Sequence, residues 1–185
     1  MIFASSAAVY GSSANPTKII GQEAPPESPY AQTKLAGEDL SRKYATNKCK
    51  FSVFRFFNVY GKGQDADSPY ASVIPKFVSL SCRNETIKIE GDGKQTRDFT
   101  YIDDIVKGVI RVLDKPAAPN ADFDPNVPDP ATSAAPYRVF NIGNGSPVPL
   151  MDYIGALEQA LGIKATKKFL PMQPGDVPTT SADTG

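Results

Sequence analysis

The chain of 185 residues carries 20 basic and 20 acidic side chains, so the formal net charge is zero, and it has no histidine. Without a basic run or an apolar stretch near the ~20 residues of a membrane span, we expect neither nucleic acid nor a membrane as partner. The missing imidazole excludes Ser-His-Asp and Cys-His catalysis and histidine-ligated metals, and no metal site is expected. Cys49 and Cys82 have no metal-like spacing, and no export signal is visible, which predicts reduced thiols in a cytoplasmic protein.

The first 34 residues combine a strand, a polar loop and the start of a helix. An apolar run at residues 1–4 indicates a buried strand that ends near Ser6, and Pro29 pre-sets the first turn of a helix expected to reach about Ala45. The apolar side of this helix is expected to carry four residues: Leu35, Ala36, Leu40 and Tyr44.

Tyr30 and Lys34 stand four residues apart, which places both side chains on one face of that helix. An ammonium group close to a phenol favours the phenolate, so Tyr30 is a candidate base at neutral pH. Ser6, at the end of the preceding strand, is a candidate to share the transferred proton. The plain alternative is a solvated surface pair.

Further along the chain, helices and strands alternate. Residues 50–57 are β-branched and aromatic and indicate a buried strand, which ends in a turn at Asn58. We then expect a helix through residues 73–80, a strand at 87–89, a short strand at 99–102 and a helix at 104–113. Residues 115–137 are rich in proline, alanine and aspartate and are expected to lack regular structure. A strand at 139–142, a helix at 150–161 ending at Gly162 and a strand at 167–170 complete the pattern.

Four motifs follow one another in a characteristic order. They are Ser-Ser-x-x-Val-Tyr-Gly with Ser-Pro-Tyr-x-x-x-Lys (5–34), Arg-Phe-Phe-Asn-Val-Tyr-Gly (55–61), Arg-Asp-Phe-x-Tyr-Ile-Asp-Asp (97–104) and Met-Gln-Pro-Gly-Asp-Val (172–177). Together they resemble the extended short-chain dehydrogenase/reductase superfamily, specifically its NAD-dependent nucleotide-sugar epimerases and dehydratases, closest to UDP-glucuronate 4-epimerase. The resemblance implies an α/β fold: a partial Rossmann-like, doubly wound sheet with a smaller α/β part that binds the UDP-sugar. Residues 1–60 would belong to the first part and 61–185 mostly to the second, with a segment near 94–114 returning to the sheet.

The same resemblance implies roles for individual residues. Ser6, Tyr30 and Lys34 would form the catalytic triad, with Tyr30 and Lys34 also at the nicotinamide ribose of NAD. The backbone at Phe56 would meet the nicotinamide amide. Substrate contacts would come from four further residues: Asn58, Arg97, Gln173 and Asp176.

Three of these substrate residues also have ordinary explanations. Asn58 suits a diphosphate or sugar contact, or a turn in which it caps its own backbone. A guanidinium such as Arg97 grips phosphate oxygens in a bidentate way, or pairs with a carboxylate. Asp176 would bind the ribose of UDP, with Gln173 nearby, although Pro-Gly-Asp by itself is only a turn.

One expected feature is missing. A dinucleotide-binding fold normally opens with a glycine-rich turn between strand and helix that holds the pyrophosphate. The glycines at 91–93 and 143–145 do not supply that motif. We therefore expect a family member without its first half-Rossmann unit, whether a truncated gene product or a piece of a longer protein, with impaired or no activity alone. Its uncovered sheet edge predicts a homo-oligomer.

The residues after Ser6 indicate the type of reaction. Dehydratases and decarboxylases of this family carry a carboxylate there, whereas this chain has Ala7 and Ala8, which cannot move a proton. The simplest cycle, a 4-epimerisation through transient oxidation of the sugar by NAD, remains. Residues 129–137 and the Met-Gln-Pro-Gly-Asp-Val ending favour UDP-glucuronate, while residues 61–65 and 70–76 resemble UDP-N-acetylglucosamine and related 4-epimerases. A non-catalytic UDP-sugar-binding fragment and an inert fragment are the other hypotheses.

Overall fold

A three-stranded parallel sheet forms the first part of the protein. The computed structural model describes residues 1–68, 72–172 and 179–185. In it β1 (Ile2–Ser6), β3 (Phe51–Phe56) and β8 (Tyr137–Ile142) pair in the order β1-β3-β8. The parallel strands confirm the predicted α/β class. That β8 pairs with β3, some 80 residues away in the chain, is a contact that no local pattern signals.

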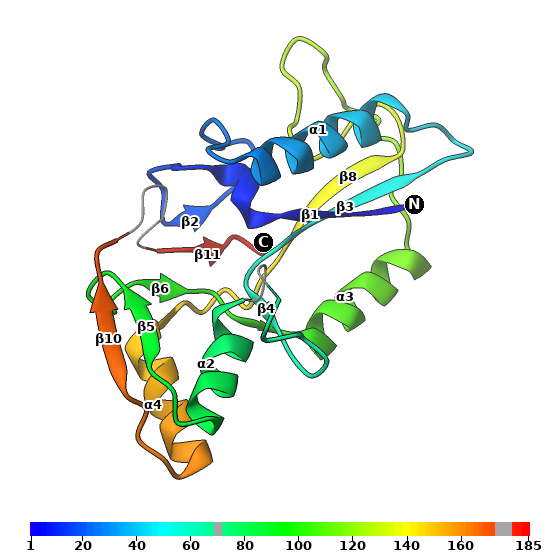
Figure 1. Ribbon diagram of the computed structural model, residues 1–185. Coiled ribbons are helices and arrows are strands. Elements are labelled where there is room, and N and C mark those ends of the chain that lie inside the picture. The colour runs from blue at the N-terminus through cyan, green and yellow to red at the C-terminus, as the bar shows by residue number, and fades with distance from the viewer. Residues whose placement is uncertain (69–71, 173–178) are drawn as a thin grey trace.

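Helices lie on both faces of this sheet (Figure 1). One face is covered by α1 (Pro29–Lys43) and the other by α3 (Ile102–Asp114). The Ser28 hydroxyl caps α1 by accepting a hydrogen bond from the Ala31 N–H at 3.1 Å. The predicted apolar side of α1 is confirmed at Leu35, which packs against a core cluster, but it is wrong at Leu40 and Tyr44, which are more than half exposed. Its buried residues are instead small or polar: Ala31, Glu38 and Ser41.

The second part, here called the α2–α4 unit, packs two helices on a two-stranded parallel sheet. It comprises α2 (Val73–Cys82), β5 (Ile87–Glu90), α4 (Leu150–Leu161) and β10 (Lys167–Leu170), with β10 paired to β5. All four elements confirm the expected periodicity, and Gly162 ends α4 with φ 67°. Five buried apolar residues form its core: Phe77, Ile87, Ile89, Leu150 and Ile154.

Short elements link the two parts. The 3₁₀ helix η1 (Ala7–Tyr10) follows β1, and three two-residue pairs join remote segments. They are β2 (Thr17–Lys18) with β11 (Ser181–Ala182), β4 (Val59–Tyr60) with β7 (Thr100–Tyr101), and β6 (Thr96–Arg97) with β9 (Val148–Pro149). Residues 115–136 carry no helix or strand, as expected. In the described ranges no helix is both long and apolar enough to span a bilayer.

The buried carboxylate of Asp98 holds these linking segments together. Asp98 has no exposed surface, and its two oxygens accept three backbone hydrogen bonds, from Asn144 (2.9 Å), Gly145 (3.0 Å) and Ala182 (2.8 Å). A Cβ at Gly143 would lie 2.8 Å from Asp98 Oδ2, so only glycine allows the chain to approach this closely. One side chain thus fixes the loop after β8 and the C-terminal β11 against β6.

We predict that Asp98→Asn destabilises the fold by about 1–3 kcal/mol, because either orientation of the amide sets its NH₂ against a backbone N–H. The free energy of unfolding, measured in urea, tests this. Asp39→Asn, at an exposed position of α1, is the matched control and should change stability by less than about 0.5 kcal/mol. Equal stability of the two variants would contradict the anchoring role of Asp98.

Candidate functional site

Predicted site residues gather at the carboxyl ends of the strands. Ser6 is the last residue of β1 and Phe56 the last of β3, and the two stand opposite each other in the strand register. Asn58 follows two residues later. In open α/β sheets this is the edge at which ligands bind. The structure therefore brings two separate motifs of the sequence, 5–34 and 55–61, to the carboxyl end of the sheet.

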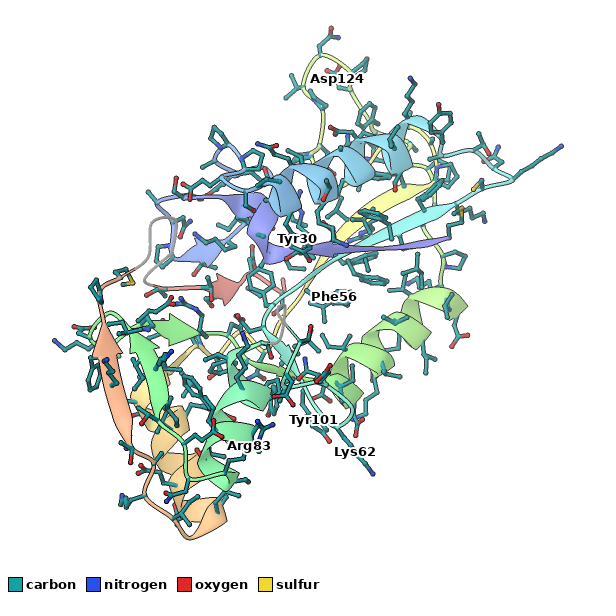
Figure 2. All side chains as sticks on the ribbon, viewed as in Figure 1. Tyr30, Phe56, Lys62, Arg83, Tyr101 and Asp124 are labelled. Carbon is teal, nitrogen blue, oxygen red and sulfur yellow. The ribbon has the colours of Figure 1, made fainter. Side chains whose placement is uncertain are left out.

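Tyr30 and Lys34 come to this edge from the first turns of α1, with Tyr30 about half exposed (Figure 2). The Lys34 ammonium lies 5.5 Å from the centre of the Tyr30 ring and 5.6 Å from that of Phe3. It also donates a hydrogen bond to the Ala4 carbonyl of β1, at 2.8 Å. The cation is thus held between helix and strand beside the phenol, as the four-residue spacing predicts.

The Ser6 hydroxyl caps the 3₁₀ helix η1. Its Oγ accepts a hydrogen bond from the Ala8 N–H at 3.2 Å, which leaves its own proton available for donation. No hydrogen bond joins Ser6 to Tyr30 within the part of the chain that the structure describes. The two side chains come from elements that pack on one core cluster of four buried residues: Val9, Tyr10, Phe57 and Ala182.

Asn58 bridges segments that are far apart in the sequence. It adopts a left-handed backbone with φ 35°, and its Nδ2 donates to the Asp98 carbonyl at 3.2 Å and to Thr180 Oγ1 at 3.3 Å. It does not cap its own backbone, so the simple turn explanation is wrong. The amide ties the end of β3 to the segments around Asp98 and Thr180.

Arg97 lies on the wall of a large cavity in the α2–α4 unit. The cavity measures about 920 Å³ and opens between α2 and β5. The half-buried Arg97 donates to the Thr96 carbonyl at 3.0 Å. Lys76, Lys88 and Arg97 put three cations on this wall, against the carboxylates of Glu85 and Glu90. The apolar part of the wall is made by Val73, Phe77, Leu80, Ile89 and Leu150.

Two predicted substrate residues, Gln173 and Asp176, fall outside the described residues. In the ranges that are described, no group of three acidic or cysteine side chains has the arrangement of a metal site.

Sequence reasoning missed a buried polar network under α1. Arg55 and Glu38 are each about 4% exposed or less, and they pair directly. Burial raises the pKa of Tyr10, whose hydroxyl donates to Asn141 Oδ1 at 2.7 Å. The available signal was Arg55 itself, a charged residue inside an otherwise apolar and aromatic strand.

Comparison with known proteins identifies the family. The family model of the NAD dependent epimerase/dehydratase family matches residues 1–143. The chain belongs to this family. The matched span includes Ser6, Tyr30, Lys34, Asn58 and Arg97, and ends at the glycine beside Asp98.

The similarity to individual members of the family covers almost the whole chain. Protein CapI of Staphylococcus aureus is 40% identical over 185 residues, which are 99% of this chain and 54% of CapI. Among solved structures, a UDP-N-acetylglucosamine 4-epimerase from Methanobrevibacter ruminantium M1 in complex with UDP-N-acetylmuramic acid is 31% identical with a TM-score of 0.80, over 99% of this chain and 53% of that one. A UDP-glucuronic acid 4-epimerase from Bacillus cereus in complex with UDP-glucuronic acid and NAD is 33% identical with a TM-score of 0.73, over 98% and 52%. The chain spans about half the length of these family members.

Proposed function

We propose that this chain carries the proton-transfer and sugar-nucleotide-binding part of an NAD-dependent UDP-sugar 4-epimerase, an isomerase. The observation that carries the proposal is the position of the Lys34 ammonium beside the Tyr30 ring, near the carboxyl end of β1, where Ser6 lies. Membership of the epimerase/dehydratase family and the similarity to two solved 4-epimerases support it.

In this proposal Tyr30 takes the proton of the sugar 4-hydroxyl and later returns it. Lys34 places a positive charge beside the Tyr30 ring, and the Ser6 hydroxyl shares the moving proton. When bound, NAD would supply the reversible hydride transfer at C4 that inverts this centre. Because Ala7 and Ala8 offer no further acid or base after Ser6, this edge supports epimerisation rather than loss of water.

The residues present fit one end of NAD. Tyr30, Lys34 and the backbone at Phe56 lie at one strand edge and would hold the nicotinamide ribose and its amide. The Lys34 ammonium has three N–H donors, of which one bonds the Ala4 carbonyl. For the pyrophosphate end the sequence contains no glycine-rich turn. The cofactor would therefore depend on groups beyond this sequence at that end.

The cavity of the α2–α4 unit suits the nucleotide diphosphate. Its volume fits the range of ligand pockets, and Arg97 can present a fork of N–H donors to phosphate oxygens. This supports a second candidate function, a UDP-sugar-binding fragment without catalysis, because the cavity lies wholly within this chain whereas a pyrophosphate loop for NAD does not.

UDP-glucuronate is the sugar nucleotide we favour. The 129–137 segment is part of the resemblance to UDP-glucuronate 4-epimerases, and Arg42 on α1 fixes it by donating to the backbone carbonyls of Asp129, Pro130 and Thr132. The similarity to a UDP-N-acetylglucosamine 4-epimerase makes that substrate the alternative.

The first prediction for this function is that any UDP-galacturonate that the purified chain forms from UDP-glucuronate and NAD, at the impaired rate expected of this chain, is lost on Tyr30→Phe. The substitution removes only the hydroxyl that moves the proton, so the rate should fall by at least about 100-fold. Proton NMR of the sugar anomeric signals measures the reaction.

Tyr44→Phe is the matched control, since Tyr44 is exposed at the far end of α1 and should leave the rate unchanged. Product formation that survives Tyr30→Phe would contradict the assignment of the base. If the parent chain forms no product but binds UDP-glucuronate, the binding-fragment function is supported instead.

We further predict that Arg97→Gln weakens binding of UDP by about 10- to 100-fold, because a charge-assisted hydrogen bond contributes about 1.5–3 kcal/mol. Isothermal titration calorimetry with UDP alone measures this without any need for turnover. Arg83→Gln is the control, because Arg83 is exposed and pairs with Asp67 outside the cavity wall. Equal affinities for the two variants would remove Arg97 from the nucleotide site.

We also propose that the chain associates with a second copy through the open side of its sheet. Val106, Ile110 and Leu113 follow helical spacing on α3 and are each about half exposed. Among the described residues, β1 pairs with β3 on one side and has no strand partner on the other. An exposed apolar helix face and an open strand edge are both surfaces that parallel sheets normally bury.

Light scattering at micromolar concentration should therefore report a mass above that of one 19.8 kDa chain. Ile110→Lys, which places a charge in the middle of this stripe, should return the mass to that of a monomer without unfolding. A monomeric parent chain would contradict this proposal.

A further inference from the structure

A row of polar side chains crosses the sheet one residue before the carboxyl ends of its strands, where the proposed catalytic residues lie. The register aligns Ser5 of β1, Arg55 of β3 and Asn141 of β8, one residue before Ser6, Phe56 and Ile142 on the same strands. The row lies on the α1 side of the sheet, since both Ser5 and Arg55 contact Glu38 of that helix. Two steps back along the strands, the corresponding row is apolar: Phe3, Val53 and Val139. A polar row in this place therefore needs an explanation other than core packing.

Arg55 is the centre of this row. Its Nε and Nη2 donate to the two oxygens of Glu38 at 3.0 and 2.7 Å, a bidentate pair. Its Nη1 donates to Glu23, and its guanidinium carbon lies 4.8 Å from the centre of the Tyr10 ring. Burial opposes the charge, yet hydrogen bonds and attraction from Glu38 outweigh it and raise the pKa of Arg55. The same guanidinium lowers the pKa of the half-buried Glu23 despite its burial.

The network touches each element that carries a proposed reactive group. Glu38 lies one helical turn after Lys34 and two after Tyr30, on the same helix. The Ser5 hydroxyl, next to Ser6, donates to Glu38. Arg55 directly precedes Phe56. Gly37 adds a close approach of helix and strand, because a Cβ there would collide with the Phe3 ring.

We propose that Glu38 and Arg55 are positioning residues. Their bidentate pair fixes the rotation of α1 and its position along the sheet, so that Lys34 and Tyr30 face the carboxyl end of β1 at Ser6. This inference rests on the proposed proton-transfer role of that edge. Neither residue needs to touch substrate or cofactor; they act through Lys34 and Tyr30.

The energetics of buried ion pairs favour this role over simple stabilisation. Removing two charges from water costs about as much as their attraction returns, and packed apolar residues in their place are often equally or more stabilising. Apolar contacts, however, are non-directional, whereas a bidentate pair fixes both distance and rotation. A helix held by apolar contacts alone can slide by a fraction of a turn at little cost, and a displacement of about 1 Å at a reactive group can lower a rate about 100-fold.

The test removes the charges of the network in one variant, with apolar side chains at three positions (Ser5→Ala, Glu38→Leu and Arg55→Met) and a neutral amide at the fourth (Glu23→Gln). We expect its melting temperature to equal or exceed that of the parent chain. Lys34 supplies a spectroscopic signature, because its ammonium lies over two aromatic rings, whose ring currents shift the ε-methylene signal of ¹³C-labelled lysine upfield. Lys34→Arg assigns that signal by removing it.

We expect the signal of the folded variant to return to the position of exposed lysines. With UDP-glucuronate and NAD, kcat should fall about 100-fold while KM changes less than about 3-fold, since the nucleotide cavity is untouched. Asp39→Asn, exposed on the same helix, is the control and should move neither readout. A folded variant with an unchanged Lys34 signal would overturn the proposal and leave the pair a purely structural contact.

Arg55→Lys is the second variant and covers the case in which the fourfold variant fails to fold. It keeps the buried charge but loses the bidentate fork. A shifted Lys34 signal in this folded variant supports the positioning role, and an unshifted one overturns it. If the parent chain shows no turnover, the proposed function fails for this chain, whereas the Lys34 signal still decides the role of Glu38 and Arg55.

Discussion

The buried guanidinium of Arg55 is the constraint on which the sheet and its reactive edge depend. A charge in the middle strand of a parallel sheet is tolerated only when carboxylates and hydrogen bonds compensate its lost hydration. Glu38 must therefore face inward from α1, and Glu23 must be drawn in from the loop before it. Once Glu38 faces the sheet, the 100° rotation per residue of a helix decides where Lys34 and Tyr30 point. The orientation of α1, the helix that carries Tyr30 and Lys34, thus follows from Arg55 on β3.

The buried carboxylate of Asp98 fixes the C-terminal segment in a similar way. Within the described residues, the hydrogen bonds of the Asp98 carboxylate come from backbone N–H groups of two segments. Asp98 directly follows Arg97, the last residue of β6, so the anchor that holds the chain also fixes the backbone from which Arg97 reaches the cavity wall. The Asn58 amide donates to the Asp98 carbonyl and so adds a further contact at this residue. The segments that carry Asn58 and Arg97 are thus held by polar groups around Asp98.

How much the sequence predicts depends on whether the deciding contact is local. Apolar periodicity predicted α2 and α4, and a β-branched and aromatic run predicted β3, within a residue or two, because those elements bury side chains that the sequence itself displays. It failed for α1, where Leu40 and Tyr44 look like core residues but the true core contact, Glu38 to Arg55, joins unlike residues 17 positions apart. The spacing of Tyr30 and Lys34 predicted their proximity because one helical turn decides it. The bridging contacts of Asn58 reach residues up to 122 positions away, and no local pattern could indicate them.

The apolar core of the α2–α4 unit and the polar network under α1 separate the two proposed functions physically. The α2–α4 unit has a core of its own, and neither Arg55 nor β1 lines its cavity, so nucleotide binding there needs neither of them. The candidate catalytic residues, in contrast, rest on a polar network and on a sheet whose outer strand β1 has a partner on one side alone among the described residues. Loss of the polar network should therefore cost turnover before it costs affinity for the nucleotide. The order of these two losses reports which part of the chain carries the chemistry and which part carries the recognition.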